Sequence, residues 1–247
     1  MTAPRSFEWV AYFRGLFMIF TAGLFTAILF PPAFLSCFLD PSGRWPSFFQ
    51  RTWMVWLLKA NRIHLKVHGM ENLGRRAHYI IVSNHASILD IPALLATFSF
   101  PVRFIAKRSL AWFPLFGWFL FFARHILIDR ASAASTRRGM RKAAALLKKG
   151  FSIIVFPEGT RTPDGEVKEF KNGAFLLALQ TKVPILPVSI SGTFEMLPRK
   201  GWCFWPGTIR LTIGNPIFGE GQSVRAADAL TVRVREIVIQ NLIAEKG

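Results

Sequence analysis

An aspartate follows a histidine by five positions in this chain, and the two could form a catalytic pair. His85 and Asp90 lie in the run N-H-A-S-I-L-D at residues 84–90, directly after an apolar stretch. On one continuous helix their side chains would point about 140° apart, at ~3.6 residues per turn. If His85 stays in a loop and a helix begins near Ser87, the carboxylate can reach one imidazole nitrogen. The other nitrogen would then act as a general base near neutral pH.

Two other interpretations of these residues stay open. Ser87 and Asp90 fit a capping box of the S-x-x-D type, in which His85 merely fills a turn. Ser87 could instead be a nucleophile in a Ser-His-Asp arrangement, although the G-x-S-x-G elbow that exposes such a serine is absent here. Capping and catalysis are compatible, since Ser87 can cap a helix while Asp90 orients His85.

Residue types that suit a phosphate group follow another apolar run. The segment P-E-G-T-R at residues 157–161 contains a glycine, which lets backbone amides approach a ligand, and an arginine, whose planar fork suits phosphate oxygens. Residues 103–149 add eleven basic side chains against one acidic side chain. Most of these suit a solvated or membrane-facing helix surface. Lys107 and Arg130, each directly after a predicted strand, are the better phosphate candidates.

Seven short apolar runs could form the scaffold that positions these side chains. They are residues 63–68, 79–83, 103–106, 126–129, 152–156, 185–190 and 208–213. Helix-like stretches lie at 136–149, 174–181 and 228–245. Strands alternating with helices are typical of an α/β domain with a largely parallel central sheet flanked by helices. Ligands in such sheets bind beyond the carboxyl ends of the strands, where the polar residues described above fall.

The composition favours a membrane-associated protein over other classes. The 247 residues carry a net charge of +17, 14% of them are aromatic, and the mean hydropathy is +0.33. A disordered chain would be poorer in apolar residues, and a nucleic-acid binder would be more hydrophilic, so we expect an anionic membrane surface and no nucleic acid as partner. Cys37 and Cys203 are too few for a disulfide scaffold and indicate a reducing environment. The carboxylates show no metal-ligand spacing, so no metal is expected.

The beginning of the chain is expected to anchor the protein to a membrane. Residues 15–39 are uncharged and long enough to cross a bilayer by the ~20-residue criterion, but the pair Pro31-Pro32 interrupts them, and helices usually end at such a pair. A second apolar segment at 48–58 suits an interfacial helix, and the turn-like residues 40–43 could join the two into a hairpin. We favour this hairpin over a single span and over a secretory signal peptide.

This interpretation divides the chain into a membrane-anchoring helical segment at 1–62 and an α/β domain at 63–247. Inside the latter, residues 110–123 are apolar but too short to span a bilayer. They are core, an interfacial segment or the lining of a groove for an acyl chain. The scattered histidines outside the candidate pair are interpreted as structural; they are His64, His68, His78 and His125.

Four sequence blocks resemble the glycerolipid acyltransferases, and most closely the 1-acylglycerol-3-phosphate acyltransferases. Residues 84–90 fit the family signature N-H-x-S-x-x-D, also written H-x4-D. Matching blocks follow in the family's order at 107–130, 156–161 and 183–188. The resemblance covers roughly residues 63 to 215 and leaves the N-terminal segment and the last helix uncovered.

The resemblance implies acyl transfer from a thioester, either acyl-CoA or acyl carrier protein, to the 2-hydroxyl of 1-acylglycerol-3-phosphate, giving phosphatidate for phospholipid synthesis. His85 would take the proton of the acceptor hydroxyl, while Asp90 would orient His85 and stabilise its charge, without an acyl-enzyme. The residues that would hold the acceptor phosphate are Glu158, Gly159, Thr160, Arg161 and, with less support, Lys107. Since Glu158 is itself anionic, we expect it to orient Arg161 or Lys107 and not to touch the ligand.

The resemblance also implies partners and a location. The partners would be membrane lipids, lysophosphatidate and the acyl thioester co-substrate, with no further cofactor, and the catalytic domain would lie on the cytoplasmic face of the membrane. An acyltransferase acting on glycerol-3-phosphate, another lysophospholipid or a lyso-aminolipid would carry the same signatures. A non-enzymatic membrane-binding protein of this fold would keep His85 only as part of a turn.

Overall fold

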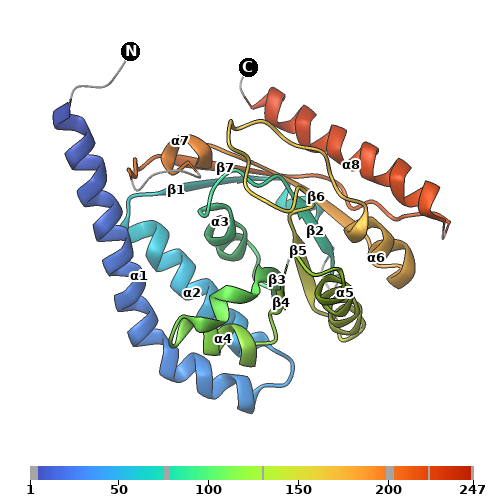
Figure 1. Ribbon diagram of the computed structural model, residues 1–247, viewed down its shortest axis with the longest axis horizontal. Helices are drawn as coiled ribbons and strands as arrows, with labels where there is room; N and C mark the ends of the chain where they lie inside the picture. Colours follow the sequence, from blue (N-terminus) through green and yellow to red (C-terminus); the bar gives the residue numbers. More distant parts are fainter. Residues whose placement is uncertain (1–4, 75–77, 130, 199–202, 222, 246–247) are drawn as a thin grey trace.

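A seven-stranded sheet forms the centre of the molecule in the computed structural model, which describes residues 5–74, 78–129, 131–198, 203–221 and 223–245 (Figure 1). The strands are β1 (His64–His68), β2 (Ile80–Ser83), β3 (Val102–Lys107), β4 (Ile126–Ile128), β5 (Ser152–Val155), β6 (Ile185–Ser191) and β7 (Thr208–Ile213). Their order across the sheet is β1-β7-β6-β2-β5-β3-β4. Every neighbouring pair is parallel except β6 with β7. The predicted largely parallel α/β sheet is therefore confirmed.

Helices cover both faces of the sheet and create two apolar cores. One core receives side chains from α2 (Arg44–Ala60), α3 (Asp90–Thr97), α4 (Phe116–Phe122) and α7 (Thr193–Met196). The other receives side chains from α5 (Ala133–Lys148), α6 (Gly173–Thr181) and α8 (Val224–Ala244). Two short 3₁₀ helices, η1 (Met70–Asn72) and η2 (Arg108–Trp112), follow β1 and β3. Because both faces are covered, β2 and β5 are buried at every position.

The two N-terminal helices form the predicted helical hairpin. α1 (Arg5–Leu39) packs against α2, and the connection is held by Asp40, whose carboxylate accepts hydrogen bonds from the N–H groups of Ser42 (2.9 Å) and Trp45 (2.7 Å). Gly43 takes a φ of 74°, a left-handed conformation that glycine adopts at little cost. A side chain there would also collide with the buried Arg103.

The predicted interruption at Pro31 and Pro32 is wrong, because α1 continues through both prolines. Prolines remove backbone donors and bend helices, and α1 changes direction in its last third (Figure 1). Beyond the prolines, the rings of Phe34 and Phe38 pack against Phe122 of α4, with centroids 5.0 and 5.3 Å apart. This long-range aromatic packing stabilises the last turns of the helix.

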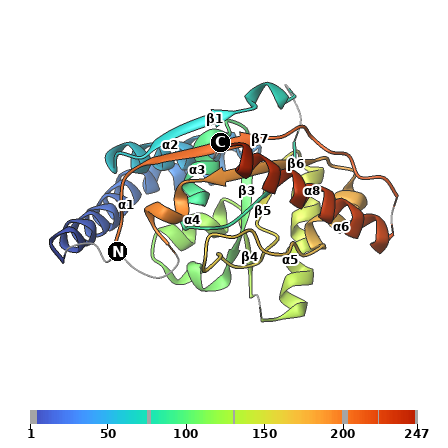
Figure 2. The same cartoon turned by 90° about the horizontal axis from the view of Figure 1, so that it is seen from above.

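The two helices of the hairpin differ in how far they join the core. α1 lies at the opposite end of the molecule from α8 (Figure 2), and among the described residues its segment Trp9–Leu39 is long and apolar enough to cross a membrane by length and composition. By contrast, α2 buries Met54 and Leu58 in the same core as the sheet. The boundary at residue 62 stays a prediction, but α2 is packed as part of the α/β body.

Candidate active site

His85 and Asp90 lie side by side in and after the loop that leaves the carboxyl end of β2. His85 stays in the loop, and its Nδ1 is 2.8 Å from Oδ2 of Asp90, with both residues buried. The same oxygen accepts the backbone N–H groups of Ala86 (2.8 Å) and Ser87 (2.9 Å). Because a carboxylate oxygen only accepts, the hydrogen bond assigns the ring proton to Nδ1. Nε2 is thereby left to take a proton from a substrate.

Ser87 forms only half of the predicted capping box. α3 begins at Asp90 and not near Ser87, and the Asp90 carboxylate accepts the Ser87 N–H as such a box requires. The Ser87 hydroxyl, however, donates to the carbonyl of Leu197 (2.6 Å) and accepts from the N–H of Leu89 (3.3 Å). These bonds occupy a fully buried hydroxyl, which weighs against the interpretation of Ser87 as a nucleophile.

Neighbouring side chains fix the loop that carries His85. The Asn84 side chain exchanges two hydrogen bonds of 2.9 Å with the backbone of Ile190 in β6. The Phe156 ring, at the end of β5, stacks on the His85 imidazole with centroids 4.0 Å apart. The carbonyl of His85 accepts the N–H of Thr162 (2.9 Å). Asn84 and Phe156 belong to the matched blocks, but their residue types alone did not indicate these contacts.

Glu158 is joined to the His85 loop by hydrogen bonds to backbone N–H groups, and its expected role in orienting Arg161 or Lys107 stays a prediction. Its Oε1 accepts the backbone N–H of His85 (2.8 Å), and its Oε2 accepts the N–H of Lys168 (3.4 Å). Burial raises the pKa of Glu158 from 4.5 to about 7, because the loss of hydration outweighs the two hydrogen bonds. A carboxyl group whose pKa is near neutral is thus bonded to the backbone of the loop that carries His85.

The remaining candidate phosphate residues lie at the carboxyl ends of β5 and β3, which are neighbours in the sheet. Gly159 has a φ of 77° in a loop that also carries the exposed Thr160, and Arg161 lines an apolar cavity beside the histidine loop. Lys107 is exposed at the end of β3. Arg130 lies outside the described residues. The structure therefore joins Glu158 directly to the His85 loop and leaves Lys107 one strand further away.

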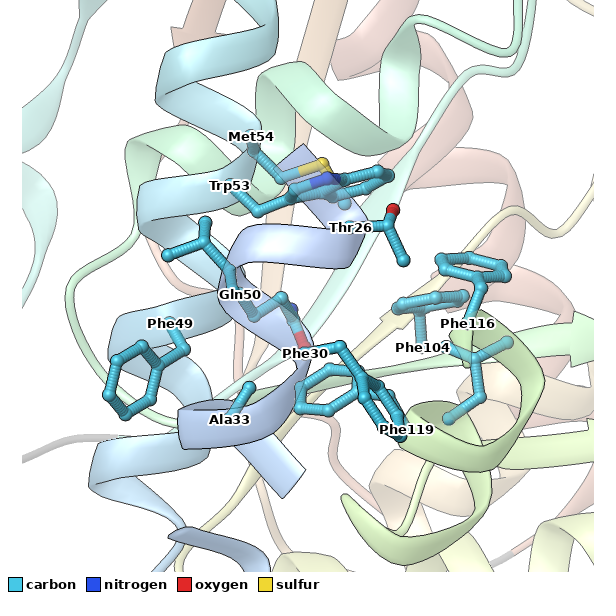
Figure 3. Close-up of a pocket in the computed structure, with 12 residues that line it drawn as sticks. Thr26, Phe30, Ala33, Phe49, Gln50, Trp53, Met54, Phe104, Phe116 and Phe119 are labelled. Carbon is cyan, nitrogen blue, oxygen red and sulfur yellow. The ribbon is translucent and has the colours of Figure 1, made fainter. Parts of the chain in front are cut away.

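The apolar cavity has a volume of about 480 Å³ and lies between the hairpin and the residues that follow His85. Leu89, next to Asp90 in the chain, lines it together with Met18 of α1 and Phe116 of α4. A second cavity of about 50 Å³ shares lining residues with the first, and Figure 3 shows its lining side chains, which come from α1, α2, β3 and α4. Apolar walls of this kind suit a hydrocarbon chain.

Residues 110–123 contribute Leu120 to the core, and their roles as an interfacial segment or an acyl-chain groove stay predictions. Leu110 and Phe116 line the large cavity, as a groove for an acyl chain would require. Trp112 and Phe113 are instead exposed. The separate prediction for His125 fits the structure, since this buried ring bonds Gln50 (2.8 Å) and burial lowers its pKa well below 6.5.

The fold and this site define the chain as an acyltransferase. A family model described as "Acyltransferase" matches residues 64–191, which include the His85 loop, the Glu158 loop and the strands that carry them.

Most of this chain aligns with known proteins of one family. The 1-acyl-sn-glycerol-3-phosphate acyltransferase of Pseudomonas aeruginosa is 33% identical over 190 residues, which cover 76% of this chain and 73% of that protein. The human 1-acyl-sn-glycerol-3-phosphate acyltransferase alpha is 33% identical over 178 residues, covering 72% of this chain and 63% of that protein. The solved 1-acyl-sn-glycerophosphate acyltransferase of Thermotoga maritima superposes with a TM-score of 0.85 at 30% identity and covers 98% of both chains. The chain therefore belongs to the lysophosphatidate acyltransferase family.

Proposed function

We propose that the protein transfers a fatty acyl group from acyl-CoA or acyl carrier protein to the 2-hydroxyl of 1-acylglycerol-3-phosphate, forming phosphatidate. The observation that carries this proposal is the hydrogen bond from His85 Nδ1 to Asp90 Oδ2, placed beside an apolar cavity that Arg161 also lines. A base, an apolar cavity and a cation are the three features that an anionic lysolipid with one free hydroxyl requires. The names of the relatives support the same acceptor.

In this reaction Nε2 of His85 takes the proton of the acceptor hydroxyl while its oxygen attacks the thioester carbonyl carbon. The C–S bond then breaks, and the leaving thiolate receives the proton from His85. Asp90 stabilises the imidazolium between the two proton transfers. A positioned base contributes about 10²–10⁴-fold, so orientation of the two lipidic substrates must supply much of the remaining acceleration.

The acceptor phosphate is assigned to the loop after β5. Arg161 offers charge-assisted hydrogen bonds, and the hydroxyl of Thr160 supplies a neutral donor. The N–H of Gly159 donates to the carbonyl of Phe156 (3.0 Å), so this glycine would shape the loop around the phosphate. Lys107 adds a more distant positive charge. Glu158 positions the backbone of His85 and does not touch the phosphate in this scheme, since both of its oxygens accept backbone N–H groups.

Both substrates and the product are amphiphiles, so the protein is proposed to work at a membrane. The exposed aromatic side chains of α1, such as Trp9, Phe13 and Phe20, would lie in the lipid and anchor residues 1–62. The catalytic domain would then lie on the cytoplasmic face, where the acyl thioesters are available.

The test is an assay of purified protein with radiolabelled acyl-CoA and 1-acylglycerol-3-phosphate in detergent micelles. Wild type should form phosphatidate, and His85→Ala should form none above background. Arg161→Ala should raise the KM for the acceptor, whereas Arg225→Ala, an exposed arginine on α8, should not. Product formed equally by His85→Ala would refute the mechanism. Product from another acceptor in a panel, and none from 1-acylglycerol-3-phosphate, would replace the acceptor only.

A further inference from the structure

A cluster of large aromatic side chains is exposed on η2, on the residue that follows it and on α4, far along the chain from the N-terminal helices. Trp112 is 86% exposed, Phe113 60%, Trp118 54% and Phe121 63%. Single exposed apolar side chains are ordinary on soluble proteins, but four large aromatics within ten residues form a patch. Such a patch costs free energy in water, and tryptophan in particular favours the boundary between lipid and water.

This patch continues the exposed aromatic surface of α1. Phe122 of α4 packs against Phe34 and Phe38 of α1. The ring centroids of Trp118 and Phe30 lie 6.2 Å apart. α1 runs directly beside α4 at the lower edge of the molecule (Figure 1). A bilayer that takes up the outer face of α1 would therefore meet the η2–α4 patch as well.

A basic cavity of about 370 Å³ lies directly behind the patch. Its wall includes Phe121 from the patch and the cations Arg108 of η2 and Arg138 and Lys142 of α5. No carboxylate lines it among the described residues. Gly139 forms part of the floor, where an added Cβ would lie 2.5 Å from the Ile128 side chain, so α5 packs closely on β4.

Lys142, one of the cations of this cavity, stands in a positive environment. Partial burial, together with the nearby charges of Arg103 and Arg124, lowers the pKa of Lys142. An anion in the cavity would relieve this repulsion. The apolar atoms of Phe121 and Leu127 beside the cations suit a ligand whose anionic group is attached to a hydrocarbon portion.

We propose that η2 and α4 form a second membrane-contact element, continuous with α1, and that the basic cavity behind it binds the phosphate group of an anionic phospholipid in the same leaflet. The occupant is a bilayer lipid because the cavity opens beside aromatic side chains, and because the charge of the protein, +17, complements an anionic surface. The inference rests on the proposed membrane anchoring, but it does not depend on the acyl-transfer chemistry.

Membrane contact is tested by fluorescence on the full chain reconstituted into vesicles of equimolar phosphatidylcholine and phosphatidylglycerol. With Cys37→Ala and Cys203→Ser as background, Phe113→Cys carries a bimane label, and Phe218→Cys is the matched control, since Phe218 is 68% exposed near α6. Nitroxide-bearing acyl chains should quench the label at 113 strongly and the label at 218 weakly. Equal quenching at the two positions would overturn the second contact, whatever the enzymatic activity of the protein.

The phosphate site is tested with the pair Arg108→Gln/Arg138→Gln against Arg225→Gln/Arg233→Gln, two exposed arginines of α8. Because the first pair removes two cations from the cavity wall, binding of fluorescent phosphatidylglycerol in non-ionic micelles should weaken about 30-fold in the first pair and little in the second. Binding of phosphatidylcholine should not change in either. Unchanged phosphatidylglycerol binding with a raised KM for acyl-CoA would assign the cavity to the donor's phosphates and overturn the proposal.

Discussion

Replacing Asp90 by asparagine should show how much the negative charge of this residue contributes to catalysis, apart from the hydrogen bonds that its side chain accepts. The Oδ2 atom accepts three hydrogen bonds, from His85 Nδ1 and from the N–H groups of Ala86 and Ser87, and an amide oxygen can accept the same three. Oδ1 is buried and has no partner among the described residues, so the amide NH₂ group would take its place. Asp90→Asn should therefore keep the loop folded and remove only the negative charge behind the imidazole.

The magnitude follows from the distance between the two groups. With Nδ1 and Oδ2 2.8 Å apart, the charge centres of an imidazolium and a carboxylate lie roughly 4 Å apart, which at an effective dielectric constant of about 20 corresponds to about 4 kcal/mol. This attraction exists only after His85 has taken the proton, so its loss falls on the transition state. We expect kcat to decrease by about 10³-fold, with little change in KM.

The assay is phosphatidate formation by purified wild type, Asp90→Asn and the control Asp228→Asn, whose carboxylate is exposed on α8. Thermal unfolding of each protein shows whether the fold is retained, because the unsatisfied buried NH₂ group should cost about 1–3 kcal/mol of stability. A folded Asp90→Asn protein with kcat within about tenfold of wild type would refute the charge-stabilisation argument.

Three further substitutions test other parts of the site. Ser87→Ala should keep activity within about tenfold and lose about 1 kcal/mol of stability through the bond to Leu197; a 10³-fold loss of kcat would indicate a nucleophile. The pKa of Glu158 is about 4.5 in the unfolded chain and about 7 in the native protein. Between these two pH values the native state binds more protons than the unfolded state, so the free energy of unfolding falls as pH rises. Glu158→Gln should remove this fall, so the stability of the variant relative to wild type should increase from about pH 5 to about pH 8, and parallel pH profiles of unfolding for the two proteins would contradict it. Ala22→Phe narrows the 480 Å³ cavity and should reduce kcat/KM about tenfold for the longest acyl chains in a chain-length series. This loss follows from ~0.8 kcal/mol for each CH₂ group that is no longer buried. Equal losses for short chains would argue that the cavity does not hold the acyl chain.

Local patterns in the sequence were sufficient to predict the strands and the pairing of His85 with Asp90. Apolar runs such as residues 79–83 and 152–156 mark strands buried on both faces, and the observed β2 and β5 agree with them within one residue. The pairing of His85 with Asp90 could be anticipated because only a short loop separates them, so few conformations keep them apart. The helix that begins at Asp90 confirms the geometric part of this prediction, although it starts later than expected.

Contacts between distant parts of the chain were decided by the tertiary structure alone. Glu158 meets the backbone of His85 across 73 positions, and Asn84 meets Ile190 across 106, because β2 lies between β5 and β6 in a strand order that no local pattern encodes. α1 continues through its prolines because Phe122, far along the chain, packs against the helix beyond them. The apolar pattern of residues 110–123 likewise does not show which side chains line the cavity and which face outward, since that depends on the position of α1. Periodicity and loop length act over a few residues, whereas packing depends on which elements become neighbours.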